Sequence, residues 1–159
     1  MATTLITTVG RLLGALIRYF GAAQGRAHDA QVARRAEQVD AVTALSVTVS
    51  DHRRAMWQHQ DAVLTGAPAA RVEELRAAQH QTRSAIAQPA VQVALLVPAA
   101  RGEADAAVRA TYAIRGARDL EDLEDRRAAA LAAHDRMVAR MVRHLDAPSA
   151  SSVRRGVVA

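Results

Sequence analysis

The sequence predicts an all-α fold: an antiparallel helical bundle or an extended helical hairpin of three to four helices, with an amphipathic N-terminal helix. Alanine, arginine and other strong helix formers dominate a chain of 159 residues in which aromatic residues make up only 3%. Apolar residues recur at the three- and four-residue spacing of a helix face. The length suits one domain with a modest core.

The first element is a helix over residues 1–23 that separates bulky aliphatic side chains from small and basic ones. At about 100° per residue, the bulky set falls within an arc of roughly 140°. Arg11 and Arg18 lie almost opposite that arc. We expect this helix to be the membrane or partner contact site, through Leu5, Ile6, Val9, Leu12, Leu13, Leu16, Ile17, Phe20, Arg11 and Arg18.

Three environments are open to this helix. It can lie on a membrane surface, with its apolar face in the headgroup boundary and its arginines on lipid phosphates. It can instead pack on the protein's own core or on a second copy. A membrane span fits less well, because Arg11 and Arg18 would each cost about 2.5–3.5 kcal/mol near the bilayer centre. A secretory signal fits poorly as well, because Arg11 interrupts the apolar stretch.

The body of the bundle is expected over residues 24–146. Apolar positions from Val32 to Leu64 have the spacing of one long helix, although the β-branched run near Ser50 allows a local break. Residues 65–68, with the sequence Thr-Gly-Ala-Pro, form a turn in which glycine ends one helix and proline begins the next.

A second helix is expected from Ala69 to Ala87, weakened or kinked at Pro89, followed by a buried helical turn or an extended connector over residues 90–97. A third helix should run from Glu103 to about Arg115. A fourth should begin at an Asp119 cap and end at Leu145, unless the last two form one bent helix. Residues 147–159 are expected to form a flexible tail.

Composition excludes several classes of chemistry. The chain has no cysteine, so disulfides, thiolate metal sites and cysteine nucleophiles are ruled out. It also has no lysine, so a phosphate-binding loop of the Gly-x-x-x-x-Gly-Lys type is absent. Residues 1–28 carry three arginines and no acidic residue, a net +3 of the chain's formal +5. Basic ends on a near-neutral body suit an anionic membrane at least as well as nucleic acid.

The six histidines do not form a recognisable metal site. His52 and His59 share a helix face but lie seven residues apart, which is about 10.5 Å along the axis. No Glu-x-x-His pair of the di-iron type occurs. We interpret His134 as a partly buried histidine with a hydrogen bond, and Trp57 as a core or interface anchor. We therefore expect no catalytic, metal or cofactor-binding residues.

The layout of the chain resembles uncharacterised actinobacterial helical proteins with an N-terminal apolar segment. The resemblance rests on the apolar first helix, the arginine-rich stretch through Arg53, Arg54 and Trp57, the Ala/Val/Leu segment ending at Pro98, and the alanine-rich second half. Such proteins look like a single N-terminal membrane anchor joined to a cytoplasmic helical body. Arg11 and Arg18 depart from that layout, since they interrupt the anchor segment.

Together these features predict a non-enzymatic, membrane-associated scaffold or interaction protein that uses its N-terminal helix for contact. One alternative is a soluble self-assembling subunit whose N-terminal helix forms the oligomer interface; the other is a nucleic-acid-binding accessory protein. The expected partners are a second copy in a homo-oligomer and an anionic membrane surface. Nucleic acid is not a favoured partner, and the sequence identifies no small-molecule substrate. The expected location is the cytoplasm, at the inner face of the cell membrane.

Overall fold

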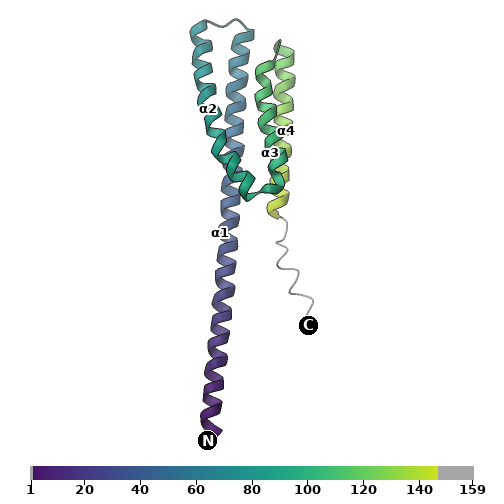
Figure 1. Cartoon of the computed structure of the whole chain (residues 1–159). Helices are drawn as coiled ribbons and strands as arrows, with labels where there is room; N and C mark the ends of the chain where they lie inside the picture. Colours follow the sequence, from purple (N-terminus) through teal and green to yellow (C-terminus); the bar gives the residue numbers. More distant parts are fainter. Residues whose placement is uncertain (1, 147–159) are drawn as a thin grey trace. The chain divides into compact units, whose positions relative to one another are not determined.

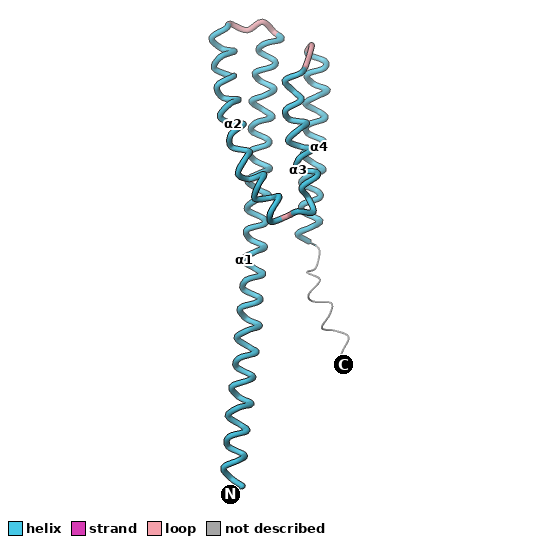
Figure 2. Tube along the Cα trace, viewed as in Figure 1, coloured by secondary structure: helices cyan, strands magenta, loops and turns pink. Residues whose placement is uncertain are grey.

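The computed structural model describes the backbone of residues 2–146 and the side chains of Arg26 and of residues 28–146. Helix accounts for nearly all of this part of the chain, and its loops are short (Figure 2). The contact pattern divides the chain into two units, between Glu37 and Gln38. Residues 2–146 form four α-helices, so the predicted all-α class with three to four helices is confirmed. The flexible tail predicted for residues 147–159 lies outside the described residues.

Helix α1 runs from Ala2 to Leu64 as one continuous helix of 63 residues. The break considered near Ser50 does not occur, in agreement with the preferred prediction. In the first unit, the side chains described up to Glu37 are exposed. Within the second unit, α1 buries one face of helical spacing, which contains Ala41, Leu45, Val49, His52 and Met56.

The turn after α1 forms as predicted. Gly66 has a φ of +68°, and Ala67 N donates to Ala62 O at 2.9 Å while Gly66 N donates to Val63 O at 3.3 Å. This pair of bonds is the Schellman pattern, in which a residue with left-handed backbone ends the helix. Pro68 then precedes α2, which runs from Ala69 to Leu96.

Alanine substitutions at Gly66 and Gly102 should change stability in opposite directions. A Cβ would meet no atom within 4 Å at either position, so packing does not distinguish them. Gly66→Ala should lower the free energy of unfolding by about 1 kcal/mol, because an L-residue is disfavoured at positive φ. Gly102→Ala, within helix α3 (Arg101–Ala113), should raise it by roughly 0.5 kcal/mol. Urea unfolding of both variants tests this, and a stabilised Gly66→Ala variant would contradict it.

Helix α2 is longer than predicted. It was expected to end near Ala87, but it continues through Pro89 for two further turns. Figure 1 shows α2 bending in its second half. The predicted end near Ala87 is wrong because tertiary packing outweighs the local cost of proline. The buried helical turn considered for the residues after Pro89 is confirmed, since the helix continues to Leu96, and Val93 and Val97 are 1% and 0% exposed. Gln38 Nε2 also donates to Leu96 O at 2.7 Å, satisfying a carbonyl at the end of the helix.

The second half of the chain forms another hairpin. A short 3₁₀ turn, Pro98–Ala100, leads into α3, Arg101–Ala113, and a second one, Ile114–Gly116, precedes α4, Leu120–Asp146. Ala117 is extended, with φ −64° and ψ 135°, so α3 and α4 are separate helices. The predicted cap is confirmed, since Asp122 N donates to Asp119 Oδ1 at 2.8 Å.

The second unit is a bundle of antiparallel helices. In Figure 1 the part of α1 from Gln38 onward pairs with α2 in the opposite direction, and α3 pairs with α4. Alanines line much of the core and allow the helices to approach closely. One core cluster contains Ala41, Leu45, Val49, Ile86, Val93, Val97, Ala100, Ala104, Ala107, Ala133, Met137 and Met141. The other contains Met56, Ile114, Ala117, Leu123 and Ala130.

Candidate functional site

The predicted contact helix lies within α1, whose backbone is helical from Ala2 onward. The predicted apolar and basic faces require a helical backbone, and the backbone here is helical. The side chains themselves lie outside those that the structure describes, and the contact site stays a prediction. These side chains are Leu5, Ile6, Val9, Leu12, Leu13, Leu16, Ile17, Phe20, Arg11 and Arg18. Among the described residues, no helix has the length and apolar character needed to cross a bilayer.

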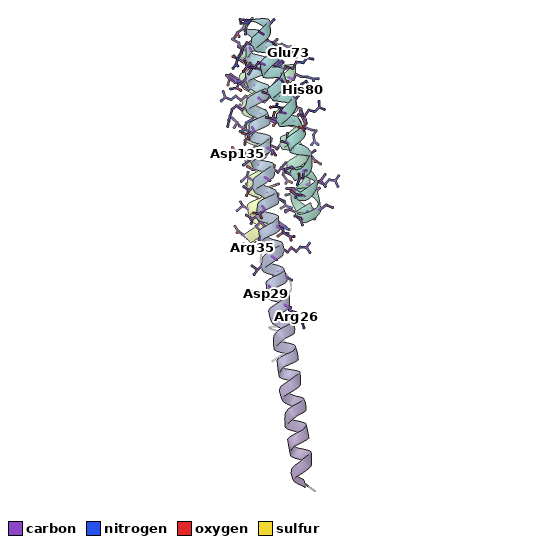
Figure 3. All side chains as sticks on the ribbon, turned by 90° about the vertical axis from the view of Figure 1, so that its left-hand side faces the viewer. Arg26, Asp29, Arg35, Glu73, His80 and Asp135 are labelled. Carbon is purple, nitrogen blue, oxygen red and sulfur yellow. The ribbon has the colours of Figure 1, made fainter. Side chains whose placement is uncertain are left out.

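The second unit contains a pocket of about 260 Å³ that opens between three helices. Its floor is made by His52 and Met56 of α1, both buried. Its remaining wall comes from α2, α3 and the 3₁₀ turn after α3, through Gln79, His80, Arg83, Tyr112 and Arg115. Figure 3 shows His80 on α2, where its side chain is exposed.

The rim of this pocket is basic. Two guanidinium groups, those of Arg83 and Arg115, line it together with the imidazole of His80, and no carboxylate does. The Arg83 guanidinium lies over the Tyr112 ring, 5.6 Å from its centroid, which is cation–π geometry. Such an arrangement can hold an anion, but it offers no carboxylate to act as a general base.

A second hollow of about 370 Å³ adjoins the first. It shares His80, Arg83 and Tyr112 with the first and adds Ser84, Ile86 and Ala87 of α2. The added surface is mainly aliphatic. The two hollows together form a groove that is basic at one end and apolar at the other.

His52 lies at the floor of the groove in an unusual state for a histidine. Its side chain is fully buried, and its Nδ1 lies 2.9 Å from Thr82 Oγ1. Thr82 Oγ1 donates to the carbonyls of Ala78 and Gln79, so it accepts from His52 Nδ1–H. His52 Nε2 is then a bare acceptor, and it is buried without a partner. The His52 and Tyr112 rings meet edge to face, with centroids 5.2 Å apart.

Burial keeps His52 neutral. Desolvation first, and then repulsion from the Arg83 guanidinium, lowers the pKa of His52 from 6.5 to about 4. The pKa of His59, two turns along α1, is also lowered, by burial and by Arg76. No group of three His, Cys, Asp or Glu side chains suited to a metal ion occurs among the described residues.

A second polar contact joins α1 to α4. His134 Nε2 lies 2.9 Å from Ser46 Oγ, and the side chain of His134 is only 14% exposed. The interpretation of His134 as a partly buried, hydrogen-bonded residue is therefore confirmed. Trp57 Nε1 donates to Glu124 Oε1 at 2.8 Å, and the Arg127 guanidinium lies 4.9 Å from the Trp57 ring centroid. Trp57 thus links two helices at the surface.

Asp122 organises the start of α4. It accepts hydrogen bonds from Arg126 Nε at 2.8 Å and from Arg118 N at 3.0 Å, and Arg126 Nη1 also donates to Ala113 O at 2.9 Å. The bond from Arg126 Nε, and after it the bond from Arg118 N, lower the pKa of Asp122 to about 2. Arg126 therefore connects Asp122 of α4 to the carbonyl of Ala113 at the end of α3.

Sequence reasoning missed the groove. Its residues come from three helices, and no motif connects His52, Arg83 and Tyr112 along the chain. A buried histidine is also indistinguishable from an exposed one without knowing what packs above it. The one usable signal was His52 on the apolar face of α1, which indicated burial but not a cavity.

Comparisons with known proteins identify relatives of this chain. A family described as KilB plasmid transfer protein matches residues 39–145. Protein KilB of Streptomyces lividans is 40% identical over 151 residues, covering 92% of this chain and 100% of that protein. No solved structure matches the chain. The family match begins at Val39, next to the first residue of the second unit, Gln38.

Proposed function

Because this chain belongs to the KilB plasmid transfer protein family, we propose that it takes part in plasmid transfer as a non-enzymatic, membrane-associated interaction protein. In this proposal the N-terminal part of α1 lies on the inner face of the cell membrane. The helical body, which the family match covers, then supplies the surface for partners, including a second copy of the chain.

One observation carries the membrane part of the proposal. Helix α1 begins at Ala2, so the bulky apolar residues from Leu5 to Phe20 are on helical backbone. On such backbone they share one face, while Arg11 and Arg18 share the opposite one. A helix of this kind binds a bilayer surface through buried apolar area, and its arginines are attracted to anionic headgroups.

Vesicle flotation of the full chain tests the proposal. The protein should float with vesicles of phosphatidylglycerol and phosphatidylcholine. The double variant Leu12→Glu and Leu16→Glu should lower the bound fraction at least about tenfold, because it places charges on the buried face. The double variant Arg11→Gln and Arg18→Gln should weaken binding to these anionic vesicles and leave weak binding to neutral vesicles unchanged.

Two valines of the same helix provide the matched control. Val32 and Val39 are 55% and 43% exposed and lie outside the predicted contact helix. Replacing both by glutamate should leave flotation unchanged. If the unmodified chain does not float, or floats equally well with the two leucines replaced, the membrane proposal is wrong. Light scattering on the same variants then shows whether the two leucines instead hold copies of the chain together.

A further inference from the structure

We propose that the groove between α1, α2 and α3 binds a small organic phosphate, with its phosphate at the arginine end and an apolar or flat body at the other. This ligand site is independent of the membrane contact proposed for the N-terminal helix. All the residues that form it lie between His52 and Arg115, within the second unit.

The charge at one end of the groove calls for an anion. Arg83 and Arg115 both line the pocket, and neither forms an ion pair within the described residues. Two guanidinium groups that line one hollow repel each other, and an anion bound between them would replace this repulsion by attraction. Guanidinium groups bind phosphate through paired N–H donors, so a phosphate is a fitting anion.

The geometry of Tyr112 holds one of these arginines in place. Its ring lies under the Arg83 guanidinium at 5.6 Å and against the edge of His52 at 5.2 Å. His52 is in turn held through Nδ1 by Thr82. The arginine is therefore supported by the Tyr112 ring, which in turn contacts the buried His52 ring, and this support reduces the entropy lost when it binds a ligand.

The other end of the groove indicates that the ligand is more than inorganic phosphate. The two hollows, of about 260 and 370 Å³, meet at His80, Arg83 and Tyr112. A phosphate ion would fill only the basic part. The side chains of Ile86 and Ala87 beyond it favour an apolar group, and the exposed part of the Tyr112 ring offers a surface for stacking.

Calorimetric titration of the full chain with three probes tests the site. Phenyl phosphate should bind several-fold more tightly than inorganic phosphate, and phenol should not bind measurably. Arg83→Gln and Arg115→Gln should each weaken phenyl phosphate binding about tenfold, because each removes a charge-assisted hydrogen bond. Both arginines are exposed, so these variants should keep the helical content and melting temperature of the unmodified protein.

Variants of Tyr112 separate recognition of the ligand's apolar body from recognition of its phosphate. Tyr112→Phe should preserve the preference for phenyl phosphate over inorganic phosphate, whereas Tyr112→Ala should abolish it. Arg136→Gln serves as the control, because Arg136 is an exposed arginine of α4 that lines neither hollow. It should leave all affinities unchanged.

A lipid headgroup also carries a phosphate, so a separate experiment distinguishes a lipid from a free organic phosphate. The Leu12→Glu and Leu16→Glu variant should bind phenyl phosphate normally, and the Arg83→Gln variant should float with anionic vesicles normally. Unchanged phenyl phosphate affinity in both arginine variants would contradict the proposed phosphate site. Loss of vesicle binding in Arg83→Gln would overturn the assignment to a free organic phosphate in favour of a lipid.

Discussion

Lowering the pH from 7 to 4 is expected to reduce the free energy of unfolding by about 3 kcal/mol through His52 alone. In the folded protein, burial and the nearby Arg83 guanidinium lower the pKa of His52 from 6.5 to about 4. In the unfolded chain the imidazole returns to its ordinary pKa. Between these two values the unfolded state binds a proton that the folded state does not. The contribution of His52 to the free energy of unfolding is therefore fully present above pH 6.5, and it is lost as the pH drops towards 4.

Urea titrations at several pH values between 7 and 4 measure this effect, and His52→Gln provides the comparison. Glutamine can keep a bond to Thr82 Oγ1 but does not titrate. The pKa of His59 is also lowered by burial and by Arg76, which acts in the same direction in both proteins and cancels in the comparison. Equal pH dependence in the two proteins would show that His52 is not held neutral.

Asp122 acts in a lower pH range and does not interfere. Its hydrogen bonds from Arg126 and Arg118 lower its pKa from 3.8 to about 2. Stability from a carboxylate with a lowered pKa is present above 3.8 and is lost as the pH falls towards 2. The interval from pH 7 to 4 therefore reports on histidines.

Replacing Leu45 by alanine is expected to lower the free energy of unfolding by about 3 kcal/mol. The Leu45 side chain is 0% exposed and belongs to the larger core cluster, where α1 packs among the other helices of the bundle. The substitution removes buried apolar surface and leaves a cavity. An alanine-rich core cannot easily close this cavity, because it has few long side chains that can move into it.

Leu95→Ala is the matched control for this substitution. Leu95 undergoes the same chemical change but is 73% exposed, so its loss should alter stability by less than about 0.5 kcal/mol. Urea unfolding of the two variants gives both values. Similar losses at the two positions would mean that Leu45 does not occupy the core of the folded protein.

The parts of the fold that could be predicted are those with a local physical cause. Gly66 and Pro68 mark the first turn because positive φ and a missing N–H have few other uses. Asp119 caps α4 because an aspartate ahead of an amphipathic run provides an acceptor for free backbone N–H groups. His134 was placed correctly because it shares a helical face with apolar residues.

The remaining parts depend on contacts between distant segments. The end of α2 is set by the burial of Val93 and Val97 against other helices, which a count of local propensities around Pro89 cannot include. The groove requires His52, Arg83 and Tyr112 to meet from three helices, and their separation in the sequence conceals this. The contact face from Leu5 to Phe20 stays a prediction from helical periodicity.

Pro89 has a consequence for the way the second helix opens. Proline has no N–H, so the carbonyl of Ala85 lacks its usual helical partner, and the ladder of hydrogen bonds in α2 has a gap in the second half of the helix. Cooperative unfolding propagates through such ladders, and a segment that unfolds cooperatively can end at a gap. We therefore expect amide hydrogen exchange to divide α2 into two segments with different protection. The segment before the gap carries the groove residues Gln79, His80 and Arg83, and the segment after it carries the core residue Val93.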